Sequence, residues 1–304
     1  MEKEKKYNVT VDVLKCYAAA LVFVCHSYIA YNAAFSFEFN SSWQFILKAP
    51  AWVGVWIFMI VSGFLAGNGF FAEKYTLTQK GIRKYYKTRF LNVIAPTWVM
   101  ISIVYILADP QIPSVSIICR FLTCMFRGGD AADGVGATWY VFTVAWLYLL
   151  TPLFVFISQK IEGRYCGKET RIYFGLLSVL AVLGMFYRVV GRLSGLTWYR
   201  WIYASPLGNI DLFWGGLVIS RIRYFLSESE WQNEKCITDK IRKATGAGIL
   251  IATLFCAYCY FYGESTKPIL LSVYRYLMPT AFLSLGGGYC LAQRNVSVTA
   301  SVTE

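Results

Sequence analysis

Long apolar stretches recur along this chain of 304 residues, and they constrain its fold more than any other feature. A helix needs about 20 predominantly apolar residues to cross the roughly 30 Å hydrocarbon layer of a bilayer. Stretches of about that length lie at residues 9–31, 50–71, 91–108, 138–158, 172–190, 201–220, 246–263 and 269–291. We therefore expect an all-α fold, a polytopic membrane bundle with about eight transmembrane helices.

The composition agrees with a membrane protein and excludes the other broad classes. Hydrophobic residues make up 57% of the chain and charged residues 15%, whereas a soluble domain carries about 25% charged residues. The abundant apolar residues also exclude a disordered chain. Nine cysteines are too few for a disulfide scaffold, and the sequence shows no His/Cys cluster with metal-ligand spacing, so we expect no metal site.

One further apolar segment is too short to be a regular span. Residues 113–126 would form a helix of about 21 Å, and they include Arg120. We interpret this segment as a short interfacial or re-entrant helix that does not cross the membrane.

The basic residues predict the orientation, because cytoplasmic loops are enriched in Lys and Arg. If 113–126 does not cross, twenty of the 29 basic residues fall on one side. They lie in the N-terminal segment, in 72–90, 159–171 and 221–243, and at Arg294. We expect both termini in the cytoplasm and a single membrane domain over residues 1–304. The net charge of +12 then reflects this bias and attraction to anionic membrane lipid, not nucleic-acid binding.

Ionisable groups inside spans are costly and mark functional candidates. The first span contains Asp12, Lys15 and His26, which is the only histidine in the chain. Lys15 and His26 are eleven residues apart, which places them on one helix face with about 16 Å between them along the axis. Asp12 can pair with Lys15, three residues later. We expect this stripe to face a polar cavity within the bundle; spacing alone supports a structural histidine about as well as a catalytic one.

Other charged residues lie within or at the edges of later spans. For Asp211 we expect an ion pair with an intramembrane arginine such as Arg275 rather than a catalytic role. Arg188, Arg192 and Arg200 lie near the predicted outer face, where they either hold an anionic acceptor or extend to the interface.

The order of the motifs resembles the acyltransferase 3 family of integral membrane acyltransferases. VDVLKCYAAALVFVCHS is similar to the opening of that family, an Asp-x-x-Arg segment with a histidine eleven residues after the arginine. Asp12, Lys15 and His26 occupy these places, and Ser27 follows. WVGVWIFMIVSGFLAG resembles the family's G-V-x-x-F-F-x-x-S-G-F-L, with matches at Gly54, Val55, Phe58, Ser62, Gly63, Phe64 and Leu65. Three later segments also resemble family motifs, through Arg89 and Pro96, Trp139 and Tyr140, and Phe213 and Gly216.

The chain departs from the family pattern in three respects. Lys15 replaces an arginine, which keeps the charge but loses the planar fork of a guanidinium. Asn92 stands where a second arginine is usual. A late S-Y-x-x-Y-L-x-H segment is absent, and about ten spans are usual where eight are expected here, so a short or C-terminally truncated member is one interpretation.

The resemblance implies a membrane acyltransferase of the cell membrane. Such an enzyme moves an acyl group, usually acetyl, from cytoplasmic acyl-CoA to a hydroxyl of a cell-surface carbohydrate or lipid-linked sugar. The co-substrate is acetyl-CoA or another acyl-CoA, and no bound cofactor is expected. A transporter or flippase for lipid-linked sugar and a truncated, inactive relative are the alternatives.

The resemblance also implies roles for particular residues. Asp12, Lys15 and His26 are the candidate catalytic residues, with Lys15 and segment 72–90 on the CoA side. His26 would act as a general base, its neutral form favoured by burial, or would carry the acyl group itself. The candidates for binding acyl-CoA or acceptor, or for donating to the oxyanion, are Ser27, Tyr28, Ser62, Arg89, Trp139, Tyr140 and Arg275.

Overall fold

The computed structural model describes residues 6–7, 9–35, 50–108, 139–164, 168–227, 235–265, 268–292 and 296–297. The chain divides into two compact units. We call residues 1–61 with 222–304 the terminal unit, and residues 62–221 the central unit. A single domain over 1–304 stays a prediction, and each unit is described by itself.

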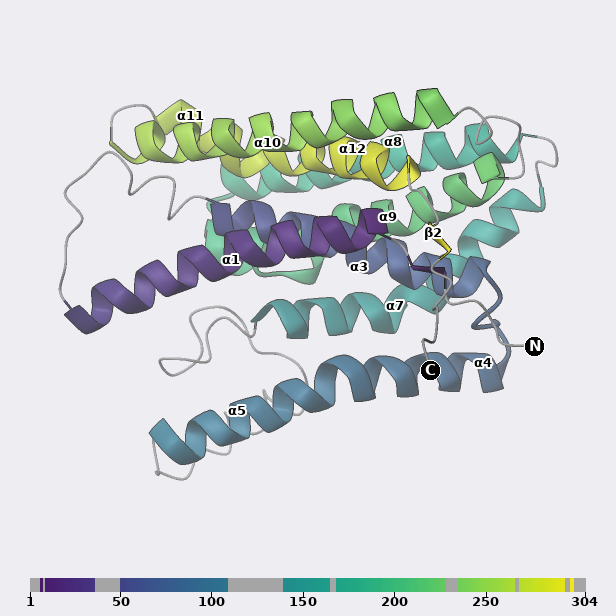
Figure 1. The fold of residues 1–304 in the computed structure, drawn as a ribbon, viewed down its shortest axis with the longest axis horizontal. Helices are drawn as coiled ribbons and strands as arrows, with labels where there is room; N and C mark the ends of the chain where they lie inside the picture. Colours follow the sequence, from purple (N-terminus) through teal and green to yellow (C-terminus); the bar gives the residue numbers. More distant parts are fainter. Residues whose placement is uncertain are drawn as a thin grey trace, which may run out of the picture. The chain divides into compact units, whose positions relative to one another are not determined.

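The described chain is almost entirely helical, which confirms the all-α fold (Figure 1). The regular helices are α1 (Val9–Phe35), α3 (Pro50–Phe71), α4 (Gln79–Arg89), α5 (Ala95–Ala108), α7 (Trp139–Glu162), α8 (Glu169–Leu193), α9 (Pro206–Ser227), α10 (Lys235–Ser265), α11 (Pro268–Ser272) and α12 (Met278–Leu291). Three wider, π-helical turns are η1 (Phe90–Ile94), η3 (Trp198–Tyr203) and η5 (Val273–Leu277). The extended segments are β1 (Lys6–Tyr7) and β2 (Val296–Ser297).

Six helices of the described residues are long and apolar enough to cross a membrane. They are Val9–Tyr28, Ala51–Phe71, Trp139–Glu162, Glu169–Leu193, Thr238–Tyr260 and Ile269–Leu291. The other two expected spans are helical but do not meet that standard. The α5 helix alone has 14 residues, and α9 contains Asp211, Arg221 and Arg223. The expected short helix at 113–126 lies outside the described residues.

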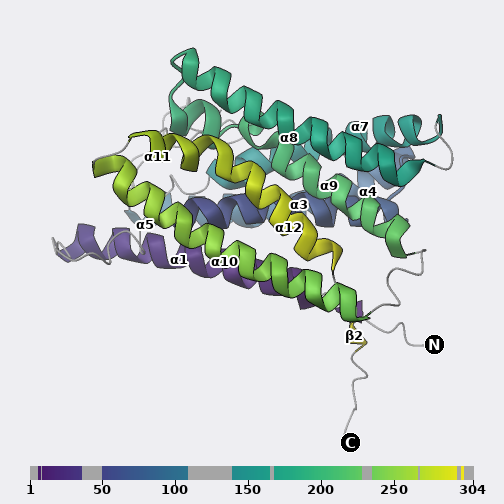
Figure 2. The same ribbon diagram turned by 90° about the horizontal axis from the view of Figure 1, so that it is seen from above.

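Helix α1 packs within the terminal unit at a position where α3 has no side chain. A Cβ on Gly54 would approach the carbonyl oxygen of Ala18 to 2.7 Å and a methyl group of Val22 to 2.8 Å. The Tyr17 hydroxyl donates to Thr253 Oγ1 at 2.9 Å, which ties α1 to α10. Helix α10 in turn runs beside α12 (Figure 2).

Two short strands from opposite parts of the sequence pair in the terminal unit. Strands β1 and β2 pair antiparallel, with Lys6 opposite Ser297 and Tyr7 opposite Val296. Segments 6–7 and 296–297, from opposite parts of the sequence, therefore lie side by side.

Close backbone packing also joins the helices of the central unit. A Cβ on Gly63 of α3 would overlap the carbonyl oxygen of Phe213 on α9, so only glycine fits there without a shift. Helix α4 begins at Thr78, whose hydroxyl accepts from the Gly81 N–H at 3.2 Å. Its Tyr86 hydroxyl donates to the Leu149 carbonyl of α7 at 2.7 Å.

Proline explains two of the wide turns. Turn η1 ends at Ile94, two residues before Pro96, and η5 ends at Leu277, two residues before Pro279. A proline ring inside an α-helix clashes with the carbonyl four residues earlier and cannot donate to it. Widening the turn relieves that clash, and π-turns of this kind occur frequently at functional sites. The residue four positions before Pro279 is Arg275, which therefore lies within a widened turn.

Candidate functional site

The stripe with the expected catalytic residues lies on one unbroken helix. Helix α1 runs from Val9 to Phe35, so Lys15 and His26 share a side with a rise of about 16 Å between them. Lys15 Nζ lies 3.0 Å from Asp12 Oδ1, which confirms the expected pair. The two side chains are 40% and 54% exposed.

The expectation that this stripe faces an internal polar cavity is wrong for the part of the chain that the structure describes. His26 and Ser27 are exposed, whereas Tyr28 is buried. The packed side of α1 is apolar because Val11, Leu14, Ala18 and Cys25 fill it. The polar stripe is consequently turned away from the helices packed on α1.

Three of the predicted binding residues gather in the central unit. The hydroxyls of Ser62 on α3 and Tyr140 on α7 share a hydrogen bond of 3.1 Å. Trp139 is buried beside them, with its ring centroid 6.3 Å from that of Tyr140 and 4.7 Å from that of Tyr203. The segment that begins at Ser62 and the pair Trp139–Tyr140 are far apart in sequence, and the Ser62–Tyr140 hydrogen bond joins them.

Arg89 lies at the end of α4 between two tyrosine rings. Its guanidinium carbon is 5.3 Å from the Tyr85 ring centroid and 4.6 Å from that of Tyr148 on α7. Among the described residues no carboxylate pairs with Arg89, and its buried Nε has no hydrogen-bond partner. A guanidinium stays charged at any physiological pH and can bind a phosphate or carboxylate in a bidentate manner. Burial raises the pKa of the Tyr85 phenol, and the charge of Arg89 opposes that rise.

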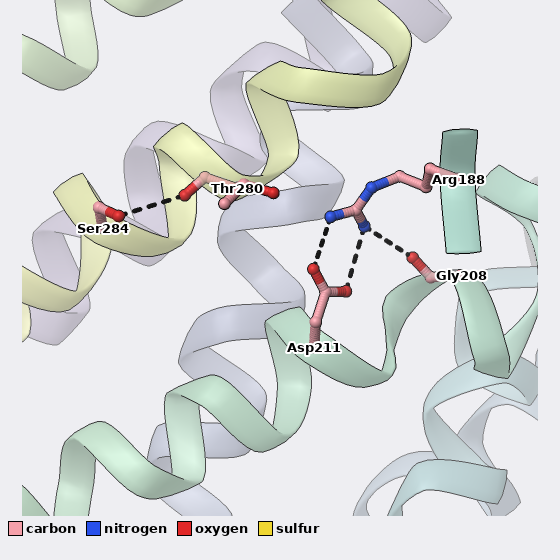
Figure 3. Close-up of polar contacts among 5 residues, drawn as sticks. All are labelled: Arg188, Gly208, Asp211, Thr280 and Ser284. Atoms are coloured by element: carbon pink, nitrogen blue, oxygen red, sulfur yellow. Dashed lines mark hydrogen bonds and ion pairs between the residues drawn. The ribbon is translucent and has the colours of Figure 1, made fainter. Parts of the chain in front are cut away.

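Asp211 pairs with Arg188, not with Arg275 (Figure 3). Arg188 Nη1 and Nη2 lie 3.1 Å and 2.6 Å from the two carboxylate oxygens, and Nη1 also donates to the Gly208 carbonyl at 3.1 Å. Both side chains are buried, with 1% and 0% exposed. The expectation that Arg188 extends to the interface or holds an acceptor at the outer face is therefore wrong. Arg192 on the same helix is exposed.

Gly184 explains how this pair fits between α8 and α9. A Cβ at residue 184 would overlap the Asp211 carboxylate, so the glycine lets the two helices approach closely. Arg188 lies one helical turn further along the same side of α8 and reaches across to the carboxylate. The pair follows from helix packing, which the linear sequence did not reveal.

Arg275 lies in an aromatic cluster of the terminal unit. Its guanidinium carbon is 5.5 Å from the ring centroid of Trp52. Trp52 stacks on Tyr274 with centroids 5.2 Å apart and an interplanar angle of 9°. Tyr260 meets Trp52 edge-on at 5.9 Å. The expected site residue is thus held by rings rather than by Asp211.

One polar cluster was not foreseen from the sequence. Glu162 accepts from Arg221 at 2.5 Å and 3.2 Å and from the Tyr173 hydroxyl at 2.9 Å. Arg221 also lies over the Phe71 ring, 4.8 Å from its centroid. The ends of α3, α7, α8 and α9 are joined here. Glu162 lies in a segment that the charge pattern treated only as a basic loop.

The structure therefore brings some predicted residues together and leaves others separate. Asp12 with Lys15, and Ser62 with Tyr140, are in direct contact. His26 and Ser27 lie on α1 of the terminal unit, as Arg275 lies on η5, while Arg89, Trp139 and Tyr140 belong to the central unit. Their roles in catalysis and binding stay predictions.

Comparison with known families gives one result. A family model described as an acyltransferase domain matches residues 8–300, nearly the whole chain. No curated protein and no solved structure matches.

Proposed function

Because this chain belongs to the acyltransferase family whose model matches residues 8–300, we propose that it moves an acyl group, which we expect to be acetyl, from the corresponding acyl-CoA to a hydroxyl of a cell-surface carbohydrate or lipid-linked sugar. The family match favours an enzyme over a transporter of lipid-linked sugar. We place the donor on the cytoplasmic side of the cell membrane.

Two observations support the proposed orientation, with both termini in the cytoplasm. Most Lys and Arg residues fall on the side that would hold both termini. The pairing of β1 with β2 supports it as well, because paired strands would lie on the same side of a membrane.

The observation that carries the proposed mechanism is the stripe on α1. A cation and an imidazole lie on one rigid helix, about 16 Å apart along its axis, and neither is buried by the described residues. Lys15, oriented by Asp12, would hold a phosphate of the donor. An extended pantetheine arm spans about that separation and would bring the thioester to His26.

In the proposed reaction, His26 acts as a general base. Its neutral imidazole takes the proton of the acceptor hydroxyl while that oxygen attacks the thioester carbonyl. The carbon–sulfur bond then breaks, and the imidazolium returns the proton to the departing thiolate. The products are the ester and free CoA. With an acyl-histidine intermediate, the same transfer would occur in two steps, from the thioester to His26 and then from His26 to the acceptor hydroxyl.

The remaining candidates have supporting roles in this proposal. Arg89, which has no carboxylate partner among the described residues, is assigned to a phosphate of the donor. Ser62 and Tyr140, whose hydroxyls share one hydrogen bond, are kept as candidates for binding the acyl-CoA or the acceptor. Ser27, Trp139 and Arg275 are kept as candidates for binding the acceptor.

The test is acyl transfer by membranes that contain the His26→Ala variant. Radiolabelled acetyl-CoA is supplied with cell-envelope glycans, and both labelled glycan and free CoA are measured. We expect a loss of at least about 100-fold in rate, the usual contribution of a general base. Phe23→Ala is the matched control, because Phe23 is also exposed on α1 and has no assigned role. Full activity of His26→Ala at equal expression would end the mechanism.

A further inference from the structure

The exposed side of α4, η1 and α5 carries two adjoining hollows. The first, of about 930 Å³, is lined by Gln79, Ile82, Arg83, Tyr86, Lys87 and Phe90. The second, of about 490 Å³, is lined by Leu91, Ala95, Pro96, Val99, Met100 and Ile103. Phe90 and Leu91 are consecutive, so the hollows follow one another along a single helical run.

The first hollow is positively charged. Arg83 and Lys87 are four residues apart, which places them side by side on α4, and both are exposed. Neither pairs with a carboxylate among the described residues. Two adjacent cations without a counter-charge favour an anionic ligand, and a phosphate group suits both side chains.

The second hollow is lined by apolar side chains alone. Residues 91–103 cover about 18 Å along a helix, close to the roughly 15 Å depth of hydrocarbon in one leaflet. Val99 is 59% exposed and Ile103 is 50% exposed. This hollow lies in the predicted span 91–108, whereas Arg83 and Lys87 lie in the predicted cytoplasmic segment 72–90. The change from charged to apolar therefore occurs where a lipid changes from headgroup to chain.

We propose that this surface is a binding site for an anionic phospholipid of the cytoplasmic leaflet. Its phosphate lies between Arg83 and Lys87, and one acyl chain follows the apolar hollow from Leu91 to Ile103. The residues that line the two hollows have no individual role in the proposed reaction, and Arg89 lies against Tyr85 and Tyr148 instead. The first hollow belongs to the segment 72–90 predicted on the CoA side, so the test separates a lipid from the acyl donor. The proposal goes beyond acyl transfer and does not depend on it.

The test measures lipid retention by the full chain, purified in a neutral detergent and mixed with phosphatidylglycerol or phosphatidylcholine. Native mass spectrometry counts the lipids that stay bound. We expect the chain to retain phosphatidylglycerol in preference to phosphatidylcholine. The double variant Arg83→Gln, Lys87→Gln should bind phosphatidylglycerol about 30-fold more weakly, which converts to about 2 kcal/mol for two basic residues.

The matched control removes the same charge from the same helix. Lys80 and Lys84 are exposed on α4 but do not line the hollow, so Lys80→Gln, Lys84→Gln should keep the wild-type affinity. An equal loss in the control would overturn the site in favour of general electrostatic attraction. Equal retention of the two lipids by the wild-type chain would also overturn it.

Competition with the wild-type chain tests the ligand class without any variant. Glycerol phosphate carries the anionic group without a chain, and palmitoyl-CoA carries both a chain and CoA phosphates. We expect no displacement of phosphatidylglycerol by glycerol phosphate at equal concentration, and we expect palmitoyl-CoA to compete no better than phosphatidylglycerol itself. Displacement by glycerol phosphate would show that the apolar hollow has no role, and much tighter binding of palmitoyl-CoA than of phosphatidylglycerol would reassign the surface to the acyl donor.

Discussion

Asp211→Asn should destabilise the central unit strongly, because it removes the charge that neutralises a buried arginine. Arg188 and Asp211 are 1% and 0% exposed, so water cannot replace the lost partner. The variant keeps the size of the side chain and one oxygen acceptor. It replaces the other oxygen, which lies 2.6 Å or 3.1 Å from a guanidinium nitrogen, with an N–H₂ donor that faces N–H groups.

Removing one partner of a buried ion pair costs about 3–5 kcal/mol. Asp211→Asn should lie near the lower end, since the Gly208 carbonyl still accepts from Arg188 at 3.1 Å. Asp211→Ala, which removes both oxygens and leaves a cavity, should lie near the upper end. Replacing both partners with apolar residues of similar volume, Arg188→Met with Asp211→Leu, should cost less than either single change, because no uncompensated charge remains.

The measurement is reversible unfolding in detergent micelles, followed by tryptophan fluorescence and fitted for the free energy of unfolding. Arg192→Gln is the control, because Arg192 is exposed on the same helix and its loss should cost no more than about 0.5 kcal/mol. If the free energy of unfolding of Asp211→Asn lies within about 1 kcal/mol of the wild-type value, the pair is not buried as described. A double variant that is less stable than both single variants would also contradict the reasoning.

Two further predictions concern the central unit. Gly63→Ala should lower the free energy of unfolding by about 1–3 kcal/mol or more, because the added Cβ overlaps the backbone carbonyl of Phe213. Gly175→Ala is the control: Gly175 is on α8, a Cβ there meets nothing within 4 Å, and the change should be neutral or stabilising. Equal losses in the two variants would contradict the described packing. Burial raises the pKa of Tyr85 above its ordinary value of 10.0, so the stability from its neutral phenol is complete below about pH 10 and falls as the pH rises further toward the folded-state value. Unfolding measured on both sides of pH 10 should show this fall in the wild type and a smaller one in Tyr85→Phe, and parallel curves would refute the assignment.

The sequence predicted the class of fold because the membrane imposes a strong and local requirement. A span must be a long apolar helix, and such stretches can be read directly from residue order. The pairing of Asp12 with Lys15, and the shared side of Lys15 and His26, could also be predicted, since both depend only on the pitch of one helix. The motif order likewise indicated the family that the domain match confirms.

Contacts between helices could not be predicted in this way. The sequence indicated that Asp211 needs an arginine, but the choice of Arg188 depends on Gly184, which lets α8 approach α9. The sequence selected Ser62 and Tyr140 separately, and their hydrogen bond exists only because α3 packs near α7. The exposure of His26 was missed because helical periodicity gives the relative directions of side chains, not which direction the neighbouring helices occupy.

Residue order alone thus indicated the long apolar helices, the membrane class, the family and the charged stripe of α1, since each follows from interactions within one segment or from a pattern along the chain. Only the tertiary structure decided which arginine neutralises Asp211, which aromatic rings contact Arg89 and Arg275, and which side of α1 is left uncovered by the described helices. These outcomes depend on how closely pairs of helices approach, which small residues such as Gly63 and Gly184 permit and which no single helix specifies.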